Sequence, residues 1–171
     1  EVMPQSELGV APAEEPHPTF VENALAKARH ASTATGLPAL ADDSGICVPA
    51  LDGAPGVYSA RYAGVDATDE LNNARLLQAM TSVADRRAHY YAVIVIMRQH
   101  EDPQPVIAEG EWHGEILRAP RGTGGFGYDP LFLDPGSGLT GAELAPSRKN
   151  RVSHRGKAMR KLLRAMTLSQ G

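Results

Sequence analysis

Two adjacent carboxylates, Asp42 and Asp43, are the first side chains in the sequence whose types and spacing suggest chemistry. Two such charges repel each other unless a cation neutralises them, and Mg²⁺ is usually held by one or two carboxylates together with substrate phosphates. Aspartate, Ser44 and Gly45 are, however, also common turn formers. Taken alone, the segment favours a solvated acidic turn, and a magnesium site is the alternative.

A second group of polar side chains precedes these aspartates. Glu15 comes before an expected helix, and Asn23 and Lys27 are four residues apart within it, so they share one helix face. Such a face can present an amide and an ammonium to one anion, whereas a solvated polar face is the simpler interpretation. Glu22 has capping-box spacing from Thr19 and needs no functional role.

A glycine-rich segment at 121–130 carries two aromatic residues and an acid. Glycine permits close backbone approach to a ligand, Phe126 or Tyr128 can stack on a base, and Asp129 can accept hydrogen bonds. A nucleotide-binding loop and a tight turn with its aromatics in the core fit this segment equally well. A basic cluster surrounds an expected helix start further along the chain: Lys149, Arg151, His154 and Arg155. Backbone amides at a helix start favour anions, which would suit an anionic ligand. Basic residues on surface helices are usually just solvated, however, and this is the simpler interpretation.

The overall composition narrows the function classes. The 171 residues carry 17 Lys and Arg against 20 Asp and Glu, a net charge of -3, so global charge gives no support for binding to nucleic acid or to an anionic membrane. No apolar run approaches the ~20 residues needed to span a bilayer, and the first residues lack a signal-peptide pattern, which predicts a cytoplasmic protein. Cys47 is the only cysteine, which excludes an internal disulfide and a cysteine-based zinc site.

These residues must be positioned by a mixed set of helices and strands. Thr19 and Gly36 have the types expected at the two ends of a helix over 20–34. A short apolar strand at 37–41 should end in a turn at the two aspartates, with strand character resuming at 46–48.

The most hydrophobic segment, 89–97, is typical of a central strand that is covered on both faces. A turn at 101–104 leads into a strand at 106–108, and the segment 114–117 continues the sheet, which predicts a hairpin or a meander. Shorter signals predict a strand at 131–133 and a capping box at 140–143. A scaffold helix is expected after Thr68, with a buried stripe of Leu71, Ala74, Leu77 and Met80, and a last helix after Ser153 carries Ala158, Leu162 and Met166. The sum is an α/β fold in a single domain over residues 1–171.

Taken together and in this order, these segments resemble the inosine triphosphate pyrophosphatase family, also called the Ham1 family. The matching segments extend over essentially the whole chain and are 19–24 (TFVENA), 27–28 (KA), 41–45 (ADDSG), 53–62 (GAPGVYSARY), 124–130 (GGFGYDP) and 153–156 (SHRG). Each segment alone has modest specificity, but the ordered set is hard to obtain by chance. The resemblance therefore outweighs the simpler interpretations of the individual segments.

The resemblance implies an elongated α/β fold of the inosine triphosphate pyrophosphatase type, with a mixed sheet and two lobes in one domain, usually as a homodimer. It also implies Mg²⁺-dependent hydrolysis of non-standard purine nucleoside triphosphates (ITP, dITP and XTP) to a nucleoside monophosphate and pyrophosphate. Carried over by motif, Asp43 is a metal ligand and the catalytic proton acceptor, Asp42 assists it, and Glu15 and Asp42 complete the metal site. The substrate-binding positions carried over in the same way are Ser44, Lys27, Phe126, Gly127, Tyr128, Asp129, Lys149, His154 and Arg155.

The start of the chain departs from the family pattern. Family members begin with a strand and a Ser/Thr-x-Asn-x-x-Lys loop that grips the triphosphate, and nothing at the start of this sequence matches it. A segment of roughly two dozen residues is therefore expected to be missing, too many for a minor loop variation. Two rival functions stay open: a nucleotide-binding regulatory module without hydrolysis, and a metal-dependent phosphohydrolase acting on a smaller phosphate ester.

Overall fold

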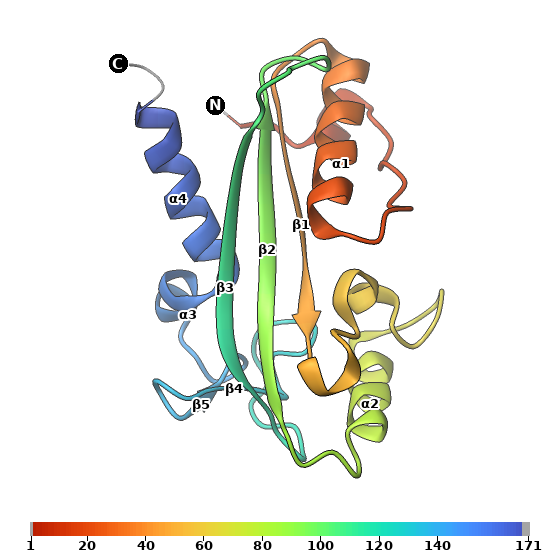
Figure 1. Cartoon of the computed structure of the whole chain (residues 1–171), viewed down its shortest axis with the longest axis vertical. Coiled ribbons are helices and arrows are strands. Elements are labelled where there is room, and N and C mark those ends of the chain that lie inside the picture. The colour runs from red at the N-terminus through yellow and green to blue at the C-terminus, as the bar shows by residue number, and fades with distance from the viewer. Residues whose placement is uncertain (1, 169–171) are drawn as a thin grey trace. The chain divides into compact units, whose positions relative to one another are not determined.

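The computed structural model describes residues 2–168, which form a mixed α/β fold, as the sequence predicts (Figure 1). The strands form one sheet in the order β1-β2-β3-β4-β5. The elements are α1 (Phe20–Thr35), β1 (Ala39–Cys47), α2 (Asp69–Ala79), β2 (Arg87–Met97), β3 (Val106–Ile116), β4 (Phe132–Asp134), β5 (Leu139–Thr140), α3 (Pro146–Val152) and α4 (His154–Leu168), with 3-10 helices at Gln5–Leu8, Pro49–Leu51 and Gly56–Arg61.

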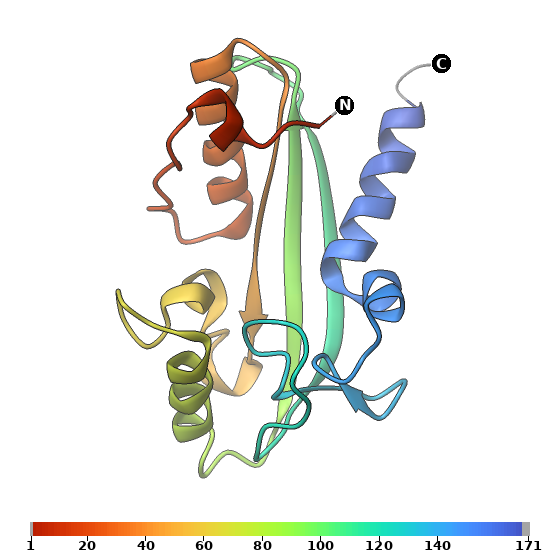
Figure 2. The same ribbon diagram turned by 180° about the vertical axis from the view of Figure 1, so that it is seen from behind.

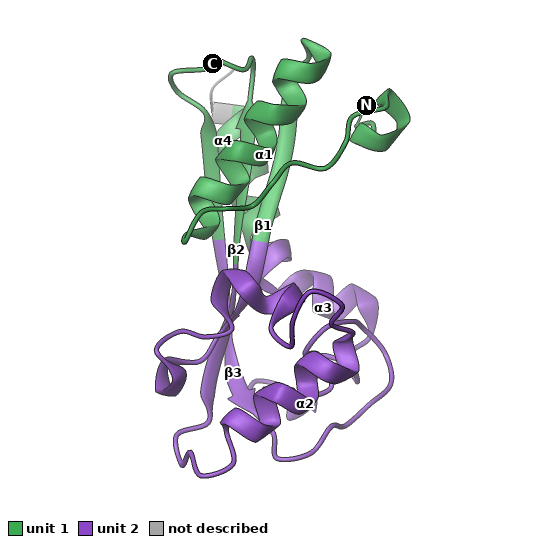
Figure 3. Cartoon of the chain, turned by 90° about the vertical axis from the view of Figure 1, so that its right-hand side faces the viewer, with its two compact units in different colours: residues 1–43, 92–109, 158–171 green, residues 44–91, 110–157 purple. Residues whose placement is uncertain are grey.

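The chain divides into two compact units (Figure 3). Unit 1 comprises residues 1–43, 92–109 and 158–171, and unit 2 comprises residues 44–91 and 110–157. β1, β2 and β3 each begin in one unit and end in the other. The boundary on β1 falls between Asp43 and Ser44, so these two candidate site residues are consecutive but belong to different units.

Unit 1 contains the helix that the sequence predicts most accurately. Thr19 Oγ1 accepts a hydrogen bond from the Glu22 amide at 3.4 Å, and Gly36, at φ 68°, closes α1 by donating its N–H to the Ser32 carbonyl. In Figures 1 and 2, α1 runs alongside β1, and α4 runs alongside β3. Both helix ends therefore form where their local signals predict them.

The second helix of unit 1, α4, covers part of the sheet. Ala158 and Leu162 pack in one buried cluster with Ala92, Ile94 and Ala108. Met166, on the same helix, is 38% exposed and is not part of this cluster. None of the helices within residues 2–168 is long and apolar enough to cross a membrane.

The acidic pair does not lie in a turn, and this prediction is wrong. β1 runs without interruption from Ala39 to Cys47, straight through the two aspartates. The buried side chain of Asp43 obtains hydrogen bonds from α1, so extended backbone at this position is compatible with a carboxylate despite its low strand propensity. A tertiary contact has overridden a local turn signal.

Unit 2 is organised around an aromatic core. The ring of Tyr90 lies 4.7 Å from that of Phe132 and 5.9 Å from that of Trp112, centroid to centroid. α2 adds Leu76 and Met80 to this core. The predicted stripe is wrong at Leu71, which is 53% exposed, and at the exposed Ala74.

The true buried side of α2 includes a polar residue, which explains the shift. Asn72 is 2% exposed. Its buried side chain accepts a hydrogen bond from the Ala63 amide at 2.8 Å and donates one to the Ala60 carbonyl at 3.1 Å. A buried amide with both bonds satisfied costs little, but hydrophobic periodicity gives no sign of it.

The remaining predicted elements are confirmed with one exception. β2, the turn after it and β3 form the predicted hairpin, and Asp102 organises the turn by accepting from the Arg98 and Gln104 amides at 3.0 and 2.9 Å. β4 pairs antiparallel with β3 and β5. No helix begins at Thr140. Its amide donates to Glu143 as in a capping box, but its hydroxyl donates to the Arg121 carbonyl, and residues 141–143 form a turn.

Candidate active site

The first part of the candidate site is a charged cluster in unit 1, the Asp43 cluster. Lys27 donates to Asp43 Oδ1 at 3.0 Å and to Glu15 Oε1 at 2.8 Å. Asn23 is fully buried, donates to Asp43 Oδ2 at 3.3 Å, and binds both the amide and the carbonyl of His17. The anion that Asn23 and Lys27 jointly meet is thus Asp43, and the simpler reading of this helix face as solvated is wrong.

Burial and ion pairing compete in setting the charges of this cluster. Burial raises the pKa of Asp43, and the hydrogen bonds from Lys27 and Asn23 offset this only in part. Burial alone would lower the pKa of Lys27, but the hydrogen bonds to Glu15 and Asp43 outweigh it, so the pKa of Lys27 is raised. The cluster therefore combines a firmly protonated ammonium with a carboxylate whose affinity for a proton is increased.

The strand determines which neighbours of Asp43 can join it. Successive side chains on a strand point to opposite faces, so Asp42 and Ser44 point away from the face that Asp43 presents to α1. Within residues 2–168 no group of three or more His, Cys, Asp and Glu side chains is arranged to hold a metal ion. The structure thus brings Glu15 and Asp43 together through Lys27 but does not gather them with Asp42 into one three-ligand group.

The second part of the candidate site is the glycine-rich loop of unit 2 at 124–129, the Phe126 loop. Asp129 is 2% exposed, accepts from the Phe126 amide at 2.8 Å, and forms an ion pair with Lys149. At Gly125, with φ 74°, any side chain would clash with the Asp129 carboxylate. The glycines are therefore needed for the close packing of this loop around one buried acid.

Two residues of α2 hold the other end of the loop. The Gly127 amide donates to Asp69 Oδ2 at 2.6 Å, and Asn73 Nδ2 donates to the Gly127 carbonyl at 2.8 Å. Both peptide groups of Gly127 are thus fixed by side chains at the start of α2. Sequence reasoning missed this role, since Asp69 reads as a charge at a helix N-terminus and α2 as ordinary scaffold.

The two aromatics of the loop have different surroundings. Phe126 is 61% exposed, and its ring is flanked by Lys149 Nζ at 4.7 Å and by Arg155 Cζ at 5.7 Å from the ring centroid. Tyr128 is 3% exposed, and its hydroxyl donates to the Ser59 carbonyl at 2.8 Å. Of the two, only Phe126 presents its ring for stacking on a ligand.

Ser59 explains part of the 53–62 segment, which sequence reasoning noted only for its resemblance. Its hydroxyl accepts from the Ile46 amide at 2.9 Å and donates to the Gly56 carbonyl at 2.6 Å. Together with the Tyr128 bond, it ties the end of β1 to the Phe126 loop.

His154 is a buried, neutral imidazole. Its ring stacks on Tyr90 with centroids 4.7 Å apart and an interplanar angle of 7°. Burial, together with the nearby charges of Arg155 and Lys149, lowers the pKa of His154 to about 3. His154 Nδ1 is buried without a hydrogen-bond partner, and a buried polar atom of this kind calls for a ligand or a water molecule.

Comparison with known proteins gives a consistent family assignment. The Ham1 family model matches residues 2–165. A protein of Nitrosomonas europaea named dITP/XTP pyrophosphatase is 63% identical over 167 residues, which cover 98% of this chain and 82% of that protein. One of the same name from Burkholderia pseudomallei is 62% identical over 166 residues, 95% of this chain and 80% of that protein.

Solved structures agree. A HAM1 protein from Coxiella burnetii has a TM-score of 0.93 and 50% identity, over 99% of this chain and 86% of that one. The Ham1 protein of Staphylococcus aureus has a TM-score of 0.89 and 38% identity, over 98% of this chain and 85% of that one. Because the family model matches nearly the whole of this chain, the chain belongs to the Ham1 family.

Proposed function

We propose that this protein hydrolyses non-standard purine nucleoside triphosphates (ITP, dITP and XTP) to a nucleoside monophosphate and pyrophosphate, and so removes them from the nucleotide pool. The observation that carries the proposal is its identity of 62–63% to two proteins named dITP/XTP pyrophosphatase. The Asp43 cluster and the Phe126 loop support it, because they supply the acid–base group and the stacking surface that this reaction needs.

The catalytic step is assigned to Asp43. The oxygen of a water molecule attacks the α-phosphorus while Asp43 accepts a proton from that water. The bond between the α-phosphorus and the oxygen that bridges to the β-phosphate breaks, and pyrophosphate leaves with its electrons. Burial raises the pKa of Asp43, which makes its carboxylate a stronger base than an exposed one. Lys27, held between Asp43 and Glu15, directs positive charge at the polyphosphate.

Magnesium is proposed as the cofactor. The two carboxylates of Glu15 and Asp43 converge on a single ammonium, a donor set that also fits an ion held by two carboxylates and substrate phosphates. When bound, Mg²⁺ neutralises phosphate charge and activates water. Asp42 remains a proposed catalytic and metal residue, acting from the opposite face of β1.

The base is assigned to the exposed ring of Phe126, with Lys149 and Arg155 at its margin. Gly127, Asp129 and Tyr128 are proposed to act by shaping this loop. Arg155 has donors and no acceptor, so it favours the 6-keto group of hypoxanthine or xanthine over the 6-amino group of adenine. His154, which is neutral with an unpartnered Nδ1, and Ser44 complete the proposed substrate contacts.

The test is product analysis with ITP, dITP, XTP, GTP and ATP at matched magnesium. We expect pyrophosphate as the inorganic product, and a kcat/KM for ATP lower than that for ITP by ~10⁴-fold, as sites built on specific hydrogen bonds achieve. Orthophosphate as the product would support the phosphohydrolase alternative, and binding without turnover the regulatory module. An unchanged preference for ITP over ATP after Arg155→Ala would refute the role given to Arg155.

Two further expectations stand as proposals. The family resemblance implies a homodimer, and the sequence pattern favours the cytoplasm. Light scattering after size exclusion tests the dimer, and a monomeric mass would contradict it.

A further inference from the structure

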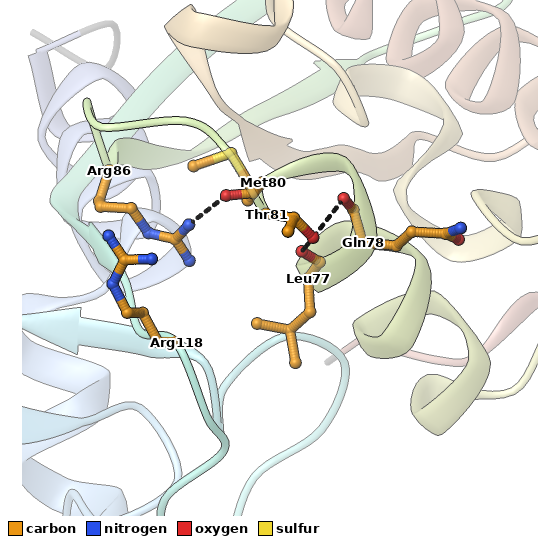
Figure 4. A pocket seen from close by; sticks show the side chains of 6 residues that line it. All are labelled: Leu77, Gln78, Met80, Thr81, Arg86 and Arg118. Carbon is orange, nitrogen blue, oxygen red and sulfur yellow. Dashed lines mark hydrogen bonds between the residues drawn. The ribbon is translucent and has the colours of Figure 1, made fainter.

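A cavity in unit 2, outside both clusters of the candidate site, is lined by two arginines. It has a volume of about 320 Å³ and lies between the end of α2, the residue before β2 and the end of the β3 region (Figure 4). Its lining residues are Leu77, Gln78, Met80, Thr81, Arg86 and Arg118. None of them is acidic, so the cavity holds two positive charges and no negative one.

Arg86 is fixed in place and still has donors to offer. Its Nε and two terminal nitrogens donate to the carbonyls of Ile116 at 2.9 Å, Met80 at 2.7 Å and Leu117 at 2.8 Å. A guanidinium carries five N–H groups, so two remain. The arginine is thus held rigidly by backbone atoms, with part of its hydrogen-bonding capacity unused.

Arg118 brings a second guanidinium, and so a second positive charge, to the same cavity. Burial and, after it, the charge of Arg118 lower the pKa of Arg86, so the two guanidinium groups are close enough to repel each other. The nearest acid in the sequence, Asp85, is bound by Arg87 at 2.6 Å instead. Among the described residues no carboxylate forms an ion pair with either arginine of the cavity.

We propose that this cavity is a binding site for an oxyanion with two or more negative charges, phosphate or pyrophosphate. Guanidinium groups match the geometry of phosphate oxygens and pair with them in a bidentate manner. A dianion neutralises both Arg86 and Arg118, whereas a single carboxylate leaves half of the charge. The carbonyl oxygen of Met80, at the end of α2, would repel an anion, but this oxygen already accepts a hydrogen bond from Arg86.

The experiment is an NMR titration of the full chain, labelled with ¹⁵N and free of magnesium and nucleotide. The assigned Nε–Hε signal of Arg86 reports on this cavity alone, even if pyrophosphate also binds at the Asp43 cluster. At constant ionic strength, we expect a saturable shift with sodium phosphate and with sodium pyrophosphate. Acetate is expected to cause a much smaller shift, and an equal response to acetate would overturn the assignment to phosphates.

Two variants make the test specific. Arg118→Gln removes one exposed guanidinium that makes no described hydrogen bond and is expected to weaken phosphate binding at least ~10-fold, the loss typical of a charge-assisted contact. Arg164→Gln removes an exposed arginine of α4, outside the cavity, and is expected to leave binding unchanged. Thermal unfolding gives a second readout, since phosphate should raise the Tm of the parent more than that of Arg118→Gln. An absent shift of Arg86, or the same affinity in Arg118→Gln, overturns the proposal.

Discussion

Replacement of Asp43 by asparagine is the sharpest test of the proposed chemistry. Asparagine has the shape of aspartate but cannot accept a proton from water, and the loss of a general base typically lowers turnover by about 10²–10⁴-fold. That factor corresponds to about 3–5 kcal/mol in the activation barrier. We therefore expect Asp43→Asn to retain at most about 1% of the parent turnover of ITP at saturating magnesium.

The structure also predicts that the fold survives this change. The asparagine oxygen can still accept from Lys27, and one hydrogen bond, that from Asn23, is lost at a cost of about 1 kcal/mol. Removing a carboxylate whose pKa is raised by burial offsets part of this loss. The Tm should move by no more than about 4 °C.

The assay is pyrophosphate release, with the Tm measured on the same samples. Glu22→Gln is the matched control, because Glu22 is an exposed carboxylate on α1, the helix that packs against Asp43, and it accepts a hydrogen bond only from the capping residue Thr19. In the parent, kcat/KM should fall as pH drops through the raised pKa of Asp43, above its usual value of 3.8, because the protonated carboxyl cannot act as a base. Turnover within tenfold of the parent, or the same acid limb in Asp43→Asn, would refute the assignment.

Further predictions concern both units. Lys27→Met should destabilise the fold by about 1.5–3 kcal/mol, the range for hydrogen bonds to charged groups. Combining Lys27→Met with Asp43→Asn should recover part of this loss of stability. Additive losses in urea unfolding would show that Lys27 and Asp43 are not coupled. Phe126→Ala should raise the KM for ITP by ~5–100-fold, since base stacking is worth about 1–3 kcal/mol, and should leave the Tm unchanged because the ring is exposed. Phe126→Trp is the control, because it keeps an aromatic ring for stacking. An unaltered KM in Phe126→Ala would show that the ring does not bind the base. His154 has a folded pKa of about 3, below the unfolded value of about 6.5, so the unfolded state binds more protons and stability is lost as pH falls from about 6.5 toward 3. His154→Phe can keep the stack on Tyr90, and its free energy of unfolding should therefore fall by about 2 kcal/mol less than that of the parent between pH 7 and pH 5. The same pH dependence of chemical unfolding in both proteins would contradict a buried neutral imidazole.

The sequence by itself determined the features that depend on near neighbours. Thr19 and Gly36 define α1 because capping requires only residues within one turn, and the hydrophobic run of β2 identifies a covered strand. The ordered motifs also indicated the family and the candidate residues. Local signals failed where a distant partner outweighed them, as at Asp43, which continues a strand because Lys27 and Asn23 satisfy its carboxylate.

Only the tertiary structure decided which side chains face each other. Phe126 and Tyr128 are equivalent in the sequence, but packing buries Tyr128 against Ser59 and leaves Phe126 exposed. The bond between Gly127 and Asp69 spans 58 positions of the chain, and no periodicity reports such a contact. Hydrophobic patterns record which face of an element is buried, whereas the partners of a buried polar group depend on how distant elements pack, and that is why the surroundings of these residues became known only from the fold.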